Sequence, residues 1–280
     1  MSFAAKTSPL EPRQEADPMS GHPNQKPVIP FIGIAFSGLS LEQVSEALLN
    51  DSPREASLVV TCNMDHAREL SVNPDFRAAY RSASIVTMDG KPLQAYARLR
   101  AGVRVPNVTG ADIFLRLFKG LDPLRHRPYF VASTHDVGSA IVGALVAKGF
   151  NRDACGYFVP PLGFERDAAG TAALIEAINK HCPSQVFLGV GAPKSEIWIW
   201  QNARHLAPAY YACFGAALEF LVGTKRRAPG WLGRLGLEWL WRLSAEPMRL
   251  SRRYARSFCF LLSLLRRKPS QIDLLNESSQ

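Results

Sequence analysis

Short apolar runs alternate with longer amphipathic segments along most of the chain. Runs rich in β-branched and aromatic residues predict strands at 28–35, 58–62, 85–88, 129–132, 156–159, 185–190 and 210–214. Between them, apolar residues at helical spacing predict helices at 41–50, 65–71, 91–101, 112–120, 137–148, 168–181 and 195–205. Ser40 and Gln43 fit a capping box at the start of the first helix. The alternation predicts an α/β domain with a mostly parallel sheet flanked by helices.

A basic amphipathic helix is predicted near the end of the chain. Its apolar residues recur at helical spacing and are Leu250, Tyr254, Phe258, Leu261, Leu262 and Leu265. The apolar run at 258–265 has eight residues, whereas about 20 are needed to span a bilayer. Such a helix either lies on a membrane surface or packs its apolar side against the core or a partner subunit.

These patterns divide the chain into four regions. Residues 1–27 are rich in Pro, Ser, Gln and charge and lack the apolar run of a secretory signal, which predicts a disordered tail. Residues 28–222 make the predicted α/β domain, residues 223–268 a basic appendage and residues 269–280 a second tail. With 280 residues, of which 47% are hydrophobic, the chain is long enough to bury one substantial core.

Positive charge is concentrated in the appendage. Between residues 225 and 268 the chain carries 12 Lys and Arg against 2 Glu, while the formal charge of the whole chain is only +9. The rest of the chain is therefore close to neutral. A basic, Trp-containing end on a near-neutral body indicates an anionic partner, which is an acidic membrane face, a diphosphate or nucleic acid.

The spacing of cysteines and histidines indicates neither a disulfide framework nor a metal site. The five cysteines are scattered without a Cys-x-x-Cys pair, which favours a reducing cytoplasm. The chain also lacks an Asp-x-Asp motif and a Gly-x-x-x-x-Gly-Lys-Ser/Thr phosphate loop. We therefore expect no metal and no cofactor. Among the histidines only His135, which follows a predicted strand, is a weak site candidate.

Polar residues follow several predicted strands, at the edge where ligands bind in parallel α/β sheets. Asp89 and Gly90 end an otherwise apolar strand, so the carboxylate is either a general base in the ligand crevice or part of an Asp-Gly turn. Thr61 and Asn63 lie one pleat apart at another strand end. Their side chains either bind a base, ribose or sugar hydroxyl, or cap the local turn.

The segment 189–194 has features of a nucleotide-binding loop. Gly189 and Gly191 follow a predicted strand and precede a helix, but Lys194 stands where the third glycine of the dinucleotide fingerprint belongs. This difference argues against an NAD-dependent oxidoreductase. Backbone N–H groups and a cation at a helix start still suit a phosphate, and the alternative is a tight turn with a solvated lysine.

Taken in order, these stretches resemble the WecG/TagA/CpsF glycosyltransferases, a bacterial family that adds a hexose-type sugar to a polyprenyl-diphosphate-linked acceptor. The resemblance covers residues 31–254. It rests on the segments 61–63, 73–77, 89–92, 108–112, 187–198, 223–231 and 236–254. The most specific block runs from Gly223 to Tyr254, through Arg227-Ala-Pro-Gly-Trp231 and Glu246-Pro-x-Arg249-x-x-Arg252-Arg253.

The resemblance implies a Rossmann-like catalytic domain, inversion at the anomeric carbon, no metal and a UDP-sugar donor. The acceptor would be a polyprenyl-diphosphate-linked saccharide at the cytoplasmic face of the membrane, where we expect the protein to associate peripherally. Asp89 matches the family's general base. We expect substrate contacts from Thr61, Asn63, Gly90, Gly110, Gly191, Pro193, Lys194, Ser195 and Glu196. The cations expected at the diphosphate are Lys194, Arg227 and one or more of Arg249, Arg252 and Arg253.

Two positions depart from the family pattern. Ser195 stands where the family usually has Gln, and residues 215–220 match its glycine-rich stretch only loosely. Both departures bear on the donor site more than on the class of reaction. Two alternatives are an NAD-dependent oxidoreductase and a basic nucleic-acid-binding protein. We expect no nucleic-acid partner, because the chain has no recognised nucleic-acid motif.

Overall fold

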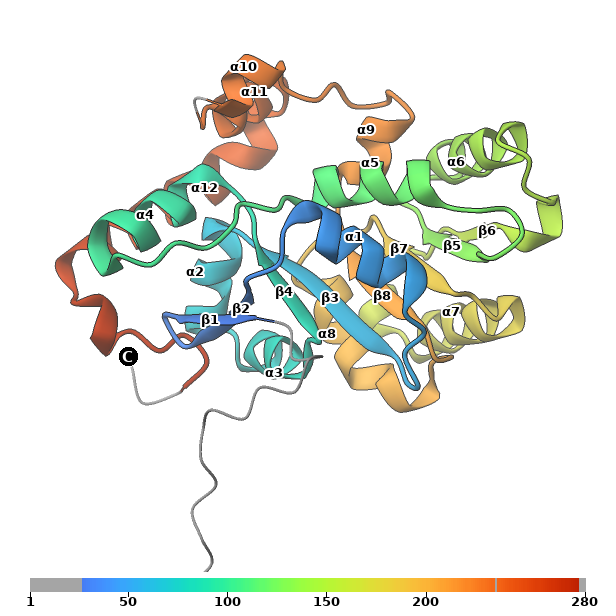
Figure 1. The fold of residues 1–280 in the computed structure, drawn as a ribbon, viewed down its shortest axis with the longest axis horizontal. Helices are drawn as coiled ribbons and strands as arrows, with labels where there is room; N and C mark the ends of the chain where they lie inside the picture. Colours follow the sequence, from blue (N-terminus) through green and yellow to red (C-terminus); the bar gives the residue numbers. More distant parts are fainter. Residues whose placement is uncertain (1–26, 235, 277–280) are drawn as a thin grey trace, which may run out of the picture.

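A six-stranded parallel sheet forms the centre of the protein (Figure 1). The computed structural model, which describes residues 27–234 and 236–276, has the strand order β4-β3-β8-β7-β5-β6. The strands are β3 (Ser57–Cys62), β4 (Ile85–Met88), β5 (Pro128–Val131), β6 (Gly156–Phe158), β7 (Gln185–Leu188) and β8 (Tyr210–Cys213). Neighbouring strands are parallel, which confirms the predicted α/β class. The tail expected at 1–27 lies outside the described residues except for Pro27.

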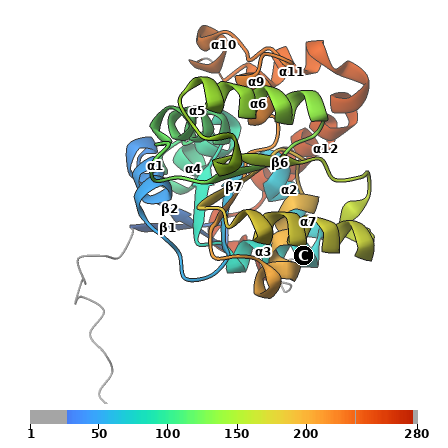
Figure 2. The same cartoon turned by 90° about the vertical axis from the view of Figure 1, so that its right-hand side faces the viewer.

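Helices cover both faces of this sheet (Figure 2). One face is covered by α1 (Leu41–Asn50), α5 (Gly110–Gly120), α6 (His135–Ala147) and α9 (Ala217–Leu221). The other is covered by α2 (Met64–Val72), α3 (Pro74–Ser82), α7 (Ala168–His181) and α8 (Lys194–Asn202). Side chains alternate along β3, so Val60 belongs to the second of these cores and Val59 to the first. Burial on both faces explains why the strands are mostly apolar.

The predicted strand at 28–35 is wrong, because a hairpin occupies this region. The chain forms β1 (Val28–Phe31) and β2 (Ile34–Ser37), which pair antiparallel outside the main sheet. Between them Ile32 and Gly33 both have positive φ, at 49° and 78°. Two left-handed residues make the tight turn whose twist fits a hairpin. The apolar Ile32 concealed this turn in the hydrophobic pattern.

Helix α3 was missed in the sequence, although it has a clear start. The Asn73 side chain accepts a hydrogen bond from the Phe76 amide at 3.1 Å, and Pro74 occupies the first turn. Both features are typical of a helix N-terminus. Phe76 and Tyr80 are buried and pack edge to face at 4.9 Å between ring centroids. The capping box of Ser40 and Gln43 at α1 is confirmed.

The appendage consists of α10 (Gly230–Arg234), α11 (Glu238–Ala245) and α12 (Pro247–Arg266). The predicted amphipathic helix is present as α12, and it divides its apolar residues between two environments. Leu250 and Leu264 are buried and α12 packs on α2, whereas Phe258, Leu262 and Leu265 are exposed. One side of α12 is therefore part of the fold and another side is open. Across the described residues, each helix is too short or too polar to cross a membrane.

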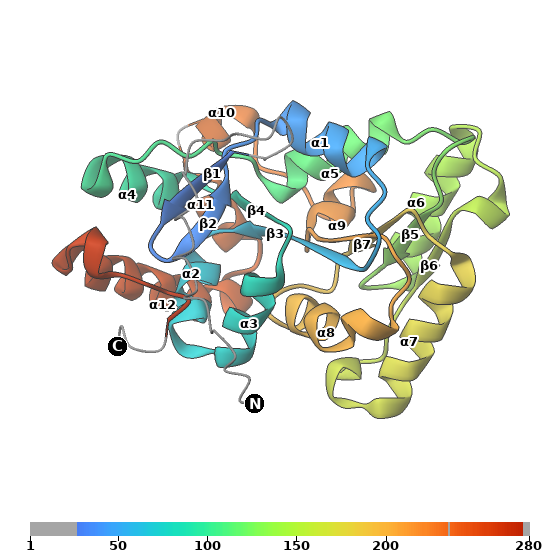
Figure 3. The ribbon, with the colours of Figure 1, turned by 60° about the horizontal axis from the view of Figure 1, so that its bottom comes forward.

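Residues 269–276 were expected to begin a tail, yet they pack against the body (Figure 3). After the short 3₁₀ helix η4 (Pro269–Gln271), Ile272 and Leu274 are buried in the core. The Leu274 amide donates to the Ile32 carbonyl at the hairpin turn, at 2.9 Å. The Arg81 guanidinium of α3 donates to the Leu275 carbonyl. The segment that follows α12 is thereby packed against the hairpin of β1 and β2 and against α3.

Candidate active site

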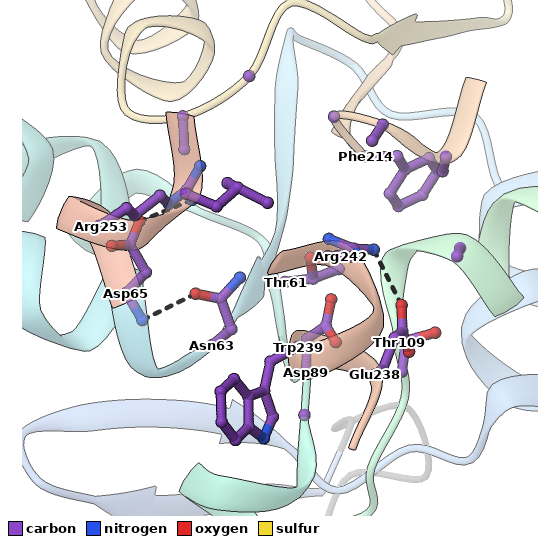
Figure 4. A pocket seen from close by; sticks show the side chains of 18 of the residues that line it. Thr61, Asn63, Asp65, Asp89, Thr109, Phe214, Glu238, Trp239, Arg242 and Arg253 are labelled. Carbon is purple, nitrogen blue, oxygen red and sulfur yellow. Dashed lines mark hydrogen bonds and ion pairs between the residues drawn. The ribbon is translucent and has the colours of Figure 1, made fainter. Parts of the chain in front are cut away.

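A large pocket opens at the carboxyl edge of the sheet, between the strand ends and the appendage (Figure 4). Its volume is about 1710 Å³, well above the range of about 300–1,000 Å³ usual for a single small ligand. Its lining combines residues that follow β3, β4, β7 and β8 with residues of α11 and α12. The pocket is therefore large enough for two substrates.

Most of the residues expected at the site line this pocket. They are Thr61, Asn63, Asp89, Gly90, Gly191, Lys194, Ser195, Glu196, Arg227, Arg249 and Arg253. Gly110 lies just behind the lining, where its amide donates to Asp89 Oδ2 at 3.4 Å. Pro193 is flanked by the lining residues Ala192 and Lys194. Arg252 is exposed and lies outside the pocket, and His135 is also outside it.

Asp89 extends into the pocket from the end of β4. Its backbone amide donates to the Cys62 carbonyl at 2.8 Å, which continues the pairing of β4 with β3 and fixes the position of the side chain. Burial raises the pKa of Asp89 to about 6, although the nearby Arg242 guanidinium opposes this rise. A carboxylate with a pKa close to neutrality is suited to accept a proton from a hydroxyl group.

Helix α11 brings three further side chains to Asp89, and the sequence analysis did not assign them to the site. Figure 4 shows Glu238, Trp239 and Arg242 around the Asp89 carboxylate. Arg242 Nη2 is 3.0 Å from Glu238 Oε1, and its guanidinium lies 5.1 Å from the centre of the Phe220 ring. These residues belong to the segment 223–254 that most specifically resembles the family. Only the tertiary structure shows that they lie beside the end of β4.

The structure shows the capping role considered for Asn63, and its ligand-binding role stays a prediction. Its Oδ1 accepts from the amides of Asp65 and His66, each at 3.0 Å, so it caps α2 as the turn interpretation predicted (Figure 4). The side-chain NH₂ group of Asn63 stays available to a ligand in the pocket. Thr61 is 5% exposed and lies against Gly110, where an added Cβ would come within 3.2 Å of Thr61 Oγ1. A larger residue at position 110 would push against Thr61 and Phe214.

The first turn of α8 places a buried acid at the pocket. Glu196 is 2% exposed, and its Oε2 has no hydrogen-bond partner among the described residues. Burial raises the pKa of Glu196 to about 7. Ser195 donates to the Gly191 carbonyl at 3.0 Å, so its hydroxyl stabilises the loop. The Lys194 ammonium lies 5.8 Å from the centre of the Phe164 ring.

Carboxylates hold several cations of the pocket. Arg227 Nη2 is 2.7 Å from Asp112 Oδ1, and Arg253 Nη2 is 2.6 Å from Asp65 Oδ2. Arg249 pairs with Glu246 in the same way. The pairs of Arg227 and Arg253 join the appendage to α5 and α2 of the body. An anionic ligand would meet these guanidinium groups already oriented by their carboxylate partners.

Neither a disulfide nor a metal cluster forms among the described residues. All five cysteines are free. In the part of the chain that the structure describes, no group of three or more His, Cys, Asp or Glu side chains is arranged to hold a metal ion.

A parallel sheet with a carboxylate at its carboxyl edge and arginines across a large pocket is an arrangement typical of α/β enzymes. Residues 29–273 match the Glycosyl transferase WecG/TagA/CpsF family. The chain belongs to this family and is a glycosyltransferase.

Two relatives come from Bacillus subtilis and Staphylococcus aureus. A protein of Bacillus subtilis is 27% identical over 197 residues, which cover 70% of this chain and 74% of the relative. A protein of Staphylococcus aureus is 23% identical over 235 residues, which cover 80% of this chain and 87% of the relative. Both are named N-acetylglucosaminyldiphosphoundecaprenol N-acetyl-β-D-mannosaminyltransferase. The family match replaces the oxidoreductase and nucleic-acid alternatives.

Proposed function

We propose that this glycosyltransferase moves a hexose-type sugar from a UDP-sugar to a polyprenyl-diphosphate-linked saccharide during the synthesis of a bacterial surface polysaccharide or exopolysaccharide. The names of the relatives support an acceptor of the N-acetylglucosaminyl-diphospho-polyprenol type and a donor sugar such as N-acetylmannosamine. The observation that carries the proposal is the position of Asp89. This carboxylate lies in a pocket large enough for two substrates and faces arginines that suit their diphosphates.

The reaction is a single displacement in which Asp89 is the general base. The acceptor hydroxyl oxygen forms a bond to the anomeric carbon as the bond from that carbon to the β-phosphate oxygen breaks. The hydroxyl proton passes to Asp89, and UDP leaves with the electron pair of the broken bond. Attack from the side opposite UDP inverts the anomeric configuration.

Negative charge that develops on the leaving diphosphate needs fixed cations. Arg253, Arg249 and Arg227 line the pocket from the appendage, and Lys194 lines it from α8. Guanidinium groups bind phosphate oxygens in a bidentate manner, and their stabilisation is strongest where water is excluded. We propose that these cations allow transfer without a metal ion. Arg252, which lies outside the pocket, is reassigned to the protein surface.

The donor nucleotide is proposed to lie along the ends of β3 and β7. Thr61, the Asn63 amide, Gly191 and Glu196 offer hydrogen-bonding groups on that side. Ser195 is bonded to the Gly191 carbonyl, so this chain lacks the long side chain that the family usually places there. We therefore expect the residues next to Ser195 to make the donor contacts at that position.

The exposed side of α12 supports peripheral association with the cytoplasmic face of the membrane. Phe258 is 61% exposed, and Leu262 and Leu265 follow it at helical spacing. Arg252 and Arg256 are exposed on the same helix. A helix of this kind binds a bilayer through apolar burial together with attraction to anionic headgroups.

The decisive experiment is a donor screen. The purified protein is mixed with an N-acetylglucosaminyl-diphospho-polyprenol acceptor and one UDP-sugar at a time, and products are identified by mass. A product with one added hexose-type residue supports the proposal. If no UDP-sugar gives a product while another class of activated sugar does, the donor assignment is wrong.

A further inference from the structure

Helix α4 (Lys91–Ala101) presents a basic surface for which the transfer reaction provides no use. Residues 91–105 contain four Lys and Arg and no Asp or Glu. Arg98 and Arg104 are exposed, and Leu99 between them is 80% exposed. These side chains line a hollow of about 570 Å³, which is separate from the active-site pocket. A large apolar side chain among basic ones is typical of a surface that meets lipid headgroups.

This surface continues onto the last turns of α12. Figures 1 and 3 show α4 and the end of α12 side by side. The Tyr96 hydroxyl donates to the Leu264 carbonyl at 3.1 Å, and Arg100 Nη2 donates to the Leu265 carbonyl at 3.0 Å. Leu265, Arg266 and Lys268 are exposed beyond this junction. No Asp or Glu occurs between residues 247 and 272.

The hollow of α4 also adjoins the mouth of the active site. Lys91, at the start of α4, lines both the hollow and the large pocket. Asp89 is two residues before it. A membrane surface that contacts α4 would therefore lie next to the active-site pocket.

We propose that α4 and the end of α12 form one docking surface for the anionic headgroups of a bilayer. The catalytic domain itself, and not only the appendage, then contacts the membrane. Charge complementarity favours anionic lipid as the occupant, since two separate chain segments contribute basic residues and neither contributes an acid. This surface is independent of the transfer chemistry, because Arg98, Leu99 and Arg104 lie outside the active-site pocket.

The test is a double charge reversal, Arg98→Glu with Arg104→Glu, in the full chain. Co-sedimentation is measured with vesicles of phosphatidylcholine with and without phosphatidylglycerol. Each basic residue lost near an anionic surface weakens binding about fivefold, so the double variant should bind the anionic vesicles at least about 25-fold more weakly. Activity on a short, water-soluble acceptor should stay at the wild-type level.

The matched control is Lys180→Glu with Arg204→Glu. Both residues are exposed, and they lie at the end of α7 and in the turn before β8, at the amino edge of the sheet. This variant has the same net charge as the first but should bind vesicles like the wild type. The proposal is overturned if the two variants lose equal affinity, or if the Arg98 and Arg104 variant binds normally. It is also overturned if the surface binds an oligonucleotide and not the vesicles.

The two proposals fail separately. Vesicle binding that depends on Arg98 and Arg104 in a protein with no transferase activity supports the docking surface and argues against the proposed reaction. The converse outcome is that the double variant binds vesicles normally and transfers sugar to a vesicle-bound acceptor at the wild-type rate. That result supports the proposed reaction and overturns the docking surface.

Discussion

Arg253 of α12 and Asp65 of α2 form an ion pair of 2.6 Å that joins the appendage to the carboxyl edge of the sheet. Asp65 also accepts a hydrogen bond from Ser257 one turn further along α12, at 3.1 Å. Both basic and acidic partners line the pocket. The pair therefore orients a guanidinium group toward the place where a diphosphate is proposed to bind.

Replacing Arg253 should weaken catalysis more than it weakens the fold. Arg253→Ala removes a charge-assisted contact worth about 1.5–3 kcal/mol, so kcat/KM should fall about 10- to 150-fold. Steady-state kinetics with varied UDP-sugar measures this loss. Asp65→Asn, which keeps the guanidinium and removes its carboxylate, is the matched control and should retain UDP binding. An equal loss of kcat/KM in both variants, with unchanged melting temperatures, would show that catalysis depends on the ion pair and not on a contact of Arg253 with the diphosphate.

Asp89→Asn should lower turnover by about 10²–10⁴-fold, the usual contribution of general base catalysis. UDP binding and the melting temperature should change little. Because the pKa of Asp89 is raised to about 6 and the base must be ionised, wild-type kcat should fall as the pH drops through this value. The residual activity of the variant should lack this acid limb. Rapid transfer by the purified variant would remove Asp89 from the mechanism.

Glu196 makes stability depend on pH in a defined direction. Its pKa rises from an ordinary value of 4.5 to about 7 because burial disfavours the charged form. The folded state thus holds a proton that the unfolded state loses, so stability falls as the pH rises from 4.5 to 7. In Glu196→Gln the free energy of unfolding should no longer show this decrease with pH, which amounts to roughly 1–3 kcal/mol. Urea unfolding at several pH values measures it, and an identical pH dependence in the variant would contradict the assignment.

Transfer should not need a divalent cation. The chain has no Asp-x-Asp motif, and arginines line the pocket where a metal would otherwise neutralise the diphosphate. Activity is measured after exhaustive dialysis against EDTA and after adding back Mg²⁺ or Mn²⁺. Full activity in the chelated sample is the expected result. Loss on chelation with recovery on Mg²⁺ or Mn²⁺ would show that a metal, and not arginine alone, balances the charge.

Removing residues 268–280 should destabilise the protein, because Ile272 and Leu274 are buried. Burial of two such side chains contributes about 3–6 kcal/mol, so the free energy of unfolding should fall by about that amount. Chemical denaturation of the truncated chain measures the change. Ser270→Ala, at an exposed position of the same segment, is the control and should change little. Unaltered stability after truncation would show that this segment contributes nothing to the core.

The sequence was sufficient to predict the alternation of buried strands and amphipathic helices. Buried strands such as β4 and β7 are mostly apolar runs, and Asp89 is visible as the acidic residue that follows β4. The Asn73-Pro74 start of α3 was available as a signal and was overlooked. The turn at Ile32 and Gly33 could not be predicted in this way, because the hydrophobic pattern does not show that the apolar Ile32 has a positive φ.

The parts that depend on tertiary contacts could not be read from the pattern. The approach of Arg242 and Glu238 to Asp89 joins positions more than a hundred residues apart along the chain. The burial of Leu274 at the hairpin turn is of the same kind, since its short segment resembles a polar tail.

Helix α12 is held by Asp65 near its middle and by Tyr96 and Arg100 near its end, whereas α11 has no buried residue. An element without buried residues opens at a lower free-energy cost than one packed into the core. We therefore expect that the nucleotide product of the proposed reaction leaves by a movement of α11 while α12 keeps its place on the body. The departure of UDP would then set the pace of successive rounds of transfer if α11 opens more slowly than the sugar is passed on.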